Sequence, residues 1–217
     1  MILCIETAST NCSVALSSPE GAIVLKEDNS QSFSHGERLH SYIGEIMEQQ
    51  GVGFADLQAI AVSKGPGSYT GLRIGVSAAK GLCFANNLPL ISVPTLTVLA
   101  HKVAEPKGQI VAMMDARRME VYSAVFDADY QQLRDTQAEI LDETSFVEYL
   151  QRGPVTFIGS GVEKFAAICN HPNANFIPEV LPSAQQMAPL AQEKLKKATF
   201  EDVAYFEPYY LKDFKLG

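Results

Sequence analysis

Hydrophobic and polar residues follow two different spacings along this chain, and the spacing changes most sharply between residues 59 and 87. Residues 59–63 form a short apolar run typical of a buried strand, and residues 64–70 are rich in Gly, Pro and Ser. From residue 71 to residue 86 apolar side chains recur at helical spacing, in a stripe made of Leu72, Val76, Ala79 and Cys83. The segment therefore predicts a strand, a tight loop and a helix.

Two further sides of this predicted helix differ in character. One is a stripe of mainly small residues, Gly71, Gly75, Ala78 and Leu82, and it predicts that a neighbouring helix or strand approaches the helix closely. The other is polar and carries Arg73, Ser77 and Lys80. Only this polar side has to face water or a partner.

The loop at residues 65–71 allows two interpretations. Glycine permits positive φ, and bare N–H groups at a helix start attract anions, which favours a phosphate site. The spacing departs from the known phosphate motifs, however, because Gly71 is followed by Leu72 and Arg73 rather than by Lys and a hydroxyl residue. The alternative is a tight strand-to-helix turn in which Ser68 or Thr70 caps the helix.

The first half of the chain has the element order of a ribonuclease H-like lobe. Three antiparallel strands are predicted first, then a helix that starts at a capping box formed by Ser34 and Glu37. The strand, loop and helix described above follow, and another strand and a short helix complete the half. The ranges of these elements are 1–6, 12–17, 22–26, 34–50, 59–63, 71–86, 90–93 and 95–102.

We place the domain boundary at residues 104–108, so residues 1–104 form one lobe and residues 105–217 a smaller one. The second lobe is predicted to contain a hairpin, a third strand, a glycine turn after a fourth strand, and helices that start at two further capping boxes. The corresponding ranges are 110–114, 120–126, 138–141, 145–151, 155–158, 159–161, 162–169 and the helix after Ser183. The predicted fold class is α/β, with two ribonuclease H-like lobes whose mixed sheets are flanked by helices.

Composition limits the partners of the chain. Seventeen Lys and Arg residues against 25 Asp and Glu residues give a formal charge of −8, so a polyanion such as tRNA would be repelled by this chain alone. The four cysteines show no CxxC pair, which is typical of reduced core residues in a cytoplasmic protein. No apolar run approaches the length of a membrane span, and we expect no membrane association.

No catalytic or metal-binding constellation is predicted. The histidines lie at positions 35, 40, 101 and 171, none beside a nucleophile elbow and none in an HExxH motif. His35 and His40 are five residues apart and cannot form an i, i+4 metal pair on a helix. The densest charge cluster, Asp115 with Arg117, Arg118 and Glu120, is either a ligand or partner site or a solvated turn.

Four segments together resemble one protein family. They are ILCIETAST at residues 2–10, SHGERL at 34–39, GPGSYTGLRIG at 65–75 and DARRMEVY at 115–122. They resemble the TsaB (YeaZ) family over most of the chain, most strongly in residues 1–125. That family is the non-catalytic subunit of the bacterial machinery that places threonylcarbamoyl on adenosine 37 of tRNA. It is related in fold to the catalytic TsaD subunit and to the actin and hexokinase (ASKHA) group.

The resemblance implies partners and an interface. A TsaD-type subunit and a TsaE-type ATPase are the expected partners, tRNA is reached only through the complex, and a homodimer can form in isolation. The helix at 34–50 and the polar side of the helix at 71–86 are the expected interface. Its residues are Leu39, Tyr42, Ile43, Ile46, Arg73, Ser77 and Lys80.

The actin and hexokinase relationship raises the question of nucleotide binding. The turn with Thr7, Ser9, Thr10 and Asn11 occupies the place of that group's first phosphate loop, but Glu6 replaces its Asp and glycine is absent. We expect no tightly bound cofactor and allow ATP or ADP at an interface shared with the partner. The alternative function is a stand-alone ATP-dependent enzyme of that group. Its weak phosphate loops count against it, as does the lack of the HxxxH metal motif of TsaD-type subunits.

Overall fold

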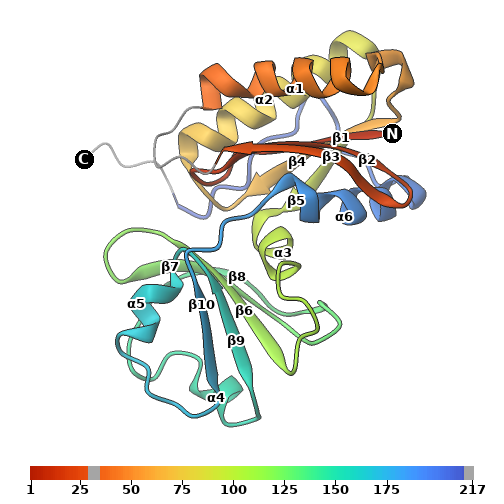
Figure 1. Cartoon of the computed structure of the whole chain (residues 1–217). Helices are drawn as coiled ribbons and strands as arrows, with labels where there is room; N and C mark the ends of the chain where they lie inside the picture. The colour runs from red at the N-terminus through yellow and green to blue at the C-terminus, as the bar shows by residue number, and fades with distance from the viewer. Residues whose placement is uncertain (29–34, 213–217) are drawn as a thin grey trace. The chain divides into compact units, whose positions relative to one another are not determined.

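The computed structural model describes residues 1–28 and 35–212, which divide into two compact units (Figure 1). Unit 1 consists of Met1–Val98 and Pro182–Tyr210, and unit 2 consists of Leu99–Leu181 with Leu211 and Lys212. Ser34, the expected cap of the first helix, lies outside the described residues.

Unit 1 is built on a mixed five-stranded sheet in the order β3-β2-β1-β4-β5. The strands are β1 (Ile2–Glu6), β2 (Cys12–Ser18), β3 (Gly21–Asp28), β4 (Ala59–Gly65) and β5 (Leu90–Pro94). The three N-terminal strands are antiparallel neighbours, whereas β4 runs parallel to β1 and to β5. Every residue of β1 is buried, because helices cover both faces of the sheet.

Helices α1 (His35–Gln50) and α2 (Tyr69–Asn86) cover one face of this sheet, and α6 (Ala184–Lys196) covers the other (Figure 1). Alternate side chains of β1 supply the two cores. Leu3 and Ile5 pack under α1 and α2, and Ile2 and Cys4 pack against α6. The short helix η1 (Phe54–Asp56) precedes β4, and the short helix α3 (Thr95–Ala100) follows β5.

The position of α6 corrects the expected domain division. Residues 105–217 do not all belong to the second lobe, because Pro182–Tyr210 lie in unit 1. Met187 and Ala191 of α6 are fully buried beside Ile2 and Ile91. A capping box and an apolar stripe predict a helix but do not indicate which sheet it covers. Ser183 is confirmed as the N-cap, since its Oγ accepts the N–H of Gln185. The expected capping box with Gln186 does not form, because Gln186 Oε1 is buried without a hydrogen-bond partner among the described residues.

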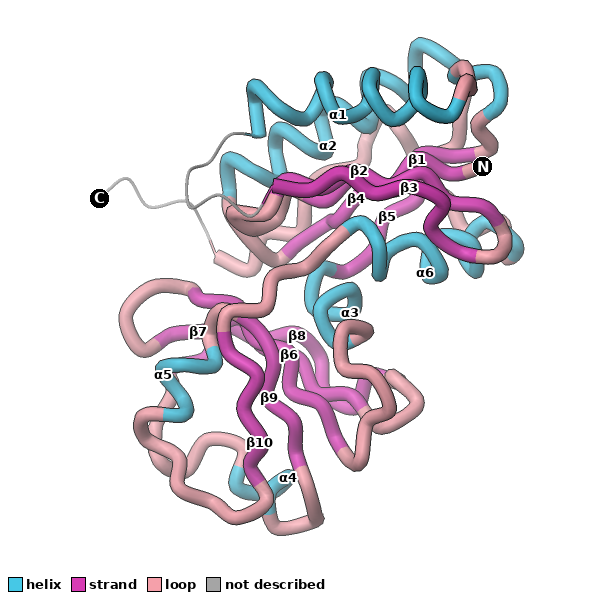
Figure 2. The backbone as a smooth tube through the Cα atoms, viewed as in Figure 1, coloured by secondary structure: helices cyan, strands magenta, loops and turns pink. Residues whose placement is uncertain are grey.

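Unit 2 contains a second mixed five-stranded sheet in the order β10-β9-β6-β7-β8 (Figure 2). β6 pairs antiparallel with β7, as in the hairpin that the pattern predicts, and parallel with β9. Short helices α4 and α5 accompany a core rich in phenylalanine. The bounds are β6 (Gln109–Asp115), β7 (Glu120–Phe126), β8 (Gln132–Ile140), α4 (Val147–Leu150), β9 (Val155–Gly159), α5 (Val162–Ala166) and β10 (Ala174–Pro178).

The predicted fold class is confirmed: both units have mixed sheets flanked by helices. Among the predicted elements, the largest error concerns the edge strands of the second sheet. β10 was not predicted, and β8 begins six residues before the expected 138–141. Edge strands keep polar residues along much of their length, so the apolar signal on which a strand prediction relies is weak there. No helix in the described part of the chain is long and apolar enough to cross a membrane.

Candidate functional site

The Gly-rich loop ends β4 and starts α2, as the sequence predicts. Ser68 is the N-cap of α2, and its Oγ accepts the N–H of Gly71 at 3.2 Å. The Ser68 N–H donates to the carbonyl of Ala8 at 2.7 Å. The N–H groups of Ser68 and Gly71 are therefore both bonded within the chain itself.

Three glycines spaced four residues apart lie against the turn after β1. A Cβ on Gly67 would lie 2.3 Å from the carbonyl oxygen of Ala8, and one on Gly71 would lie 2.1 Å from that of Thr7. A Cβ on Gly75 would lie 2.2 Å from Thr7 Oγ1. No side chain fits at such distances, so the glycines allow α2 to approach this turn closely. The expected close approach of a neighbouring element is confirmed at Gly71 and Gly75, whereas Ala78 and Leu82 of the same stripe are half-buried.

Most of the polar side chains in the turn of residues 7–11 form hydrogen bonds with other groups of the protein. Thr7 Oγ1 donates to the carbonyl of Gly71 at 2.8 Å, and Ser9 Oγ accepts the N–H of Asn11 at 3.2 Å. Asn11 Nδ2 donates to the carbonyl of Pro182 at 3.0 Å. Thr7, Ser9 and Asn11 are buried, and Thr10 is half-buried. Nucleotide contact by this turn stays a prediction, and Thr10 is the residue that could make it without rearrangement.

His35, at the start of α1, is buried against the same turn. Its Nε2 lies 2.8 Å from the carbonyl oxygen of Ser9. Burial lowers the pKa of His35 below its ordinary value, although the bond to Ser9 opposes the shift. His35 therefore stays neutral in the folded chain at pH 7.

We expect the stability of unit 1 to fall in mild acid because of His35. Its folded pKa is lower than the unfolded value of 6.5, so the unfolded state binds the proton more readily. The contribution of the neutral ring is complete above pH 6.5 and is lost as the pH falls towards the lowered folded value. Thermal melts at a series of pH values should show a smaller loss for His35→Gln than for the parent.

The control for this measurement is His40→Gln, because the His40 side chain is exposed on the same helix. It should keep the pH dependence of the parent. An unchanged pH dependence in His35→Gln would assign the acid sensitivity to other groups.

Three of the expected interface residues lie in the core instead. Leu39 and Ile46 are fully buried and Ile43 is 4% exposed, packed with the residues of β1 and β2. The apolar side of α1 is therefore used by the sheet and by α2. These three residues cannot contact a partner, which corrects that part of the predicted interface.

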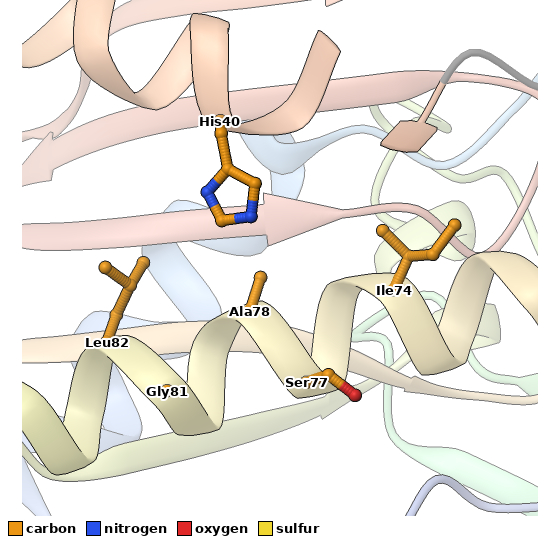
Figure 3. Close-up of a pocket in the computed structure, with 6 residues that line it drawn as sticks. All are labelled: His40, Ile74, Ser77, Ala78, Gly81 and Leu82. Atoms are coloured by element: carbon orange, nitrogen blue, oxygen red, sulfur yellow. The ribbon is translucent and has the colours of Figure 1, made fainter. Parts of the chain in front are cut away.

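The outer face of α1 and α2 carries a shallow groove of about 380 Å³. Ile74, Ala78 and Leu82 of α2 point from one side towards His40 of α1 (Figure 3). Ser77 and Gly81 complete its lining. The sequence analysis placed Ala78 and Leu82 in the small stripe with Gly71 and Gly75 but missed Ile74, which lies on the same side of the helix at a spacing of four residues.

The polar side of α2 meets the C-terminal segment of unit 1. Lys80 Nζ donates to the carbonyls of Ala204 at 3.2 Å and Phe206 at 2.8 Å. The Arg73 guanidinium lies 4.9 Å from the centre of the Tyr69 ring. Ser77 lies between two grooves, because it also lines a second one of about 360 Å³ with Arg73, Lys80 and residues 206–208 and 210. A partner at this side would contact the C-terminal segment as well as the helix.

The thiols are not suited to nucleophilic chemistry. Burial raises the pKa of Cys4 to about 12, that of Cys12 to about 11 and that of Cys83 to about 12. Within residues 1–28 and 35–212, no three His, Cys, Asp or Glu side chains gather as metal ligands would. The described residues therefore offer neither an activated thiol nor a metal centre.

The second glycine turn, in unit 2, is also filled by protein groups. A Cβ on Gly159 would lie 2.1 Å from the carbonyl oxygen of Met113. Ser160 Oγ accepts the N–H of Asp115 at 3.2 Å, and the Gly161 N–H donates to Met113 at 3.2 Å. The turn therefore joins β9 to β6 closely.

Comparison with known proteins agrees with the resemblance of the motifs. A family model described as TsaD, tRNA N6-adenosine threonylcarbamoyltransferase, matches residues 29–216. The chain is 30% identical to the tRNA threonylcarbamoyladenosine biosynthesis protein TsaB of Escherichia coli (strain K12), over 98% of this chain and 94% of that protein. The TsaB protein of Haemophilus influenzae is also 30% identical, over 98% of this chain and 93% of its own length.

A shorter match and a solved structure complete the comparison. A tRNA N6-adenosine threonylcarbamoyltransferase of Geobacillus kaustophilus is 45% identical over 83 residues, which are 37% of this chain and 24% of that enzyme. A crystal structure from Pseudomonas aeruginosa, described as similar to peptidase YEAZ, superimposes with a TM-score of 0.86. It covers 97% of this chain and 99% of its own, at 24% identity, and so shares the fold. This chain belongs to the TsaB (YeaZ) family.

Proposed function

We propose that this chain is a non-catalytic subunit of the complex that forms threonylcarbamoyladenosine at position 37 of tRNA. It pairs with a TsaD-type catalytic subunit and helps to recruit a TsaE-type ATPase, in the cytoplasm. The names of its full-length relatives support a role in this pathway. With a formal charge of −8, the chain reaches tRNA through the complex rather than alone.

The observation that carries the proposal is the groove on the outer face of α1 and α2. Apolar side chains line it on helices whose other sides already cover the sheet. An exposed apolar groove of this kind fits a helix of another subunit. The interface therefore centres on Ile74, Ala78 and Leu82, with Tyr42, Arg73, Ser77 and Lys80 of the original prediction nearby on the same two helices.

The occupant we propose is a TsaD-type subunit. The threonylcarbamoyltransferase of Geobacillus kaustophilus matches 37% of this chain at 45% identity, so such an enzyme shares part of its sequence with this chain. Two related subunits can pack their corresponding helix pairs against each other across a local two-fold axis. A homodimer in the absence of the partner would use the same groove.

A stand-alone ATP-dependent enzyme is the alternative function. It would need a phosphate loop and a metal, whereas Thr7, Ser9 and Asn11 are buried and the Gly-rich loop packs on Thr7 and Ala8. ATP or ADP can still bind at an interface shared with the partner, where Thr10 is the half-exposed member of the turn.

Reconstitution with one component left out at a time tests the proposal. We expect the chain to co-elute with a TsaD-type subunit, and we expect modification of a tRNA transcript to stop when the chain is omitted. The chain alone should not turn over ATP with Mg²⁺. Modification that proceeds equally well without the chain would overturn the proposed function, and phosphate release or transfer by the chain alone would favour the alternative.

A further inference from the structure

The tip of the β6–β7 hairpin in unit 2 carries two positive charges that form no ion pair in the part of the chain that the structure describes. Arg117 and Arg118 are both exposed. Neither guanidinium forms an ion pair or a hydrogen bond with another residue of the described ranges, 1–28 and 35–212. Both belong to the segment DARRMEVY, whose chemistry the proposed function leaves unexplained.

The carboxylates nearest to these arginines in the hairpin are paired with other cations. Asp115 Oδ2 lies 2.9 Å from Lys164 Nζ, and Glu120 forms an ion pair with Lys212. Lys164 also donates to the carbonyl of Glu120 at 3.2 Å. The four cations and two carboxylates leave a local excess of two positive charges, on a chain whose formal charge is −8.

The backbone at both arginines has a conformation that is unfavourable for residues with a Cβ atom. Arg117 has φ 73° and Arg118 has φ 51°, so two successive residues with a Cβ are left-handed. Asn and Gly are the usual residues at such positions of a hairpin. Hydrogen bonds hold the turn, because Asp115 Oδ1 accepts the N–H of Arg117 at 2.5 Å and Ser160 Oγ accepts that of Asp115. The stability of this turn therefore does not explain why arginine occupies both positions.

We propose that Arg117 and Arg118 bind backbone phosphates of tRNA in the assembled complex; this inference rests on the proposed function. Guanidinium groups bind phosphate oxygens in bidentate geometry. Phosphates are bound by exposed cations without a buried apolar centre, whereas a specific protein interface normally needs one. The hairpin tip supplies a local site for the polyanion that the rest of the acidic chain repels.

The test is a double variant, Arg117→Asn with Arg118→Gly, in complex with the TsaD-type subunit. Asn and Gly suit the left-handed turn, so the melting temperature should stay the same or rise by a few degrees. Co-elution with the partner should be unchanged. The affinity of the complex for a tRNA transcript with adenosine 37 should fall about tenfold, and the slope of log affinity against log salt should decrease by about 1 to 2.

Lys196→Gln with Lys197→Gln is the matched control, because it removes two positive charges from the C-terminal end of α6 and its C-cap, in unit 1. It should bind the transcript like the parent complex. Equal affinity and equal salt dependence in the arginine variant would overturn the inference, and so would loss of co-elution, since the tip would then face a protein. If the parent chain itself does not assemble with the TsaD-type subunit, the proposed function fails and the inference fails with it.

Discussion

Gly71→Ala is expected to lower the free energy of unfolding of unit 1 by about 3 kcal/mol and its melting temperature by roughly 10 °C. The new Cβ would lie 2.1 Å from the carbonyl oxygen of Thr7, which is a backbone atom and cannot swing away as a side chain can. Relief requires α2 to move off the turn after β1. That movement would break the hydrogen bond from Thr7 Oγ1 to the carbonyl of Gly71. Thermal melts followed by circular dichroism measure the effect.

Gly81→Ala is the matched control in the same helix. A Cβ at this position meets no heavy atom within 4 Å, so the substitution should stabilise α2 by about 0.5–1 kcal/mol through the lower backbone entropy of alanine. If both variants melt at the temperature of the parent, the close approach of α2 to Thr7 does not exist in solution.

Ala78→Glu is expected to abolish co-elution with a TsaD-type subunit and, with it, tRNA modification. Ala78 lies half-buried among the groove residues between Ile74 and Leu82, so a partner helix would bury the new carboxylate without a counter-ion. An unpaired buried charge costs several kcal/mol, which corresponds to at least a 100-fold weaker complex. Before association the carboxylate can reach water, so the melting temperature of the free chain should change little.

The control is Ala166→Glu, which adds the same charge to an exposed position of α5 in unit 2. It should co-elute and support modification like the parent. A folded Ala78→Glu chain that still binds and supports modification would show that the groove is not the interface.

Local patterns predicted most of the elements and much of the chemistry. The change from strand to helical spacing located β4 and α2, and Ser183 located the start of α6. The small stripe at Gly71 and Gly75 predicted that a neighbouring element lies close to the helix, because glycine has no side chain to keep it away. His35 and His40 are five residues apart, which predicted that their side chains cannot act as a pair. In the structure His35 is buried and His40 is exposed.

The predicted interface shows why part of the site could not be found in this way. An apolar stripe on α1 indicates which side is buried, but not how much of it a sheet and a second helix already cover. Leu39, Ile43 and Ile46 were therefore assigned to a partner, although the core uses them fully. The groove residues Ile74, Ala78 and Leu82 become a common surface only because α1 packs beside α2.

The sequence by itself determined the class of fold, the family motifs and the close approach at Gly71 and Gly75, because these depend on the spacing of neighbouring residues. The tertiary structure decided which distant segments meet. It placed the turn at Thr7 against α2 and placed α6 on the sheet of unit 1. It also left Arg117 and Arg118 at a hairpin tip without an ion pair to any residue within 1–28 and 35–212. The physical reason is that such contacts join residues far apart in the chain, where side-chain periodicity carries no information about the partner.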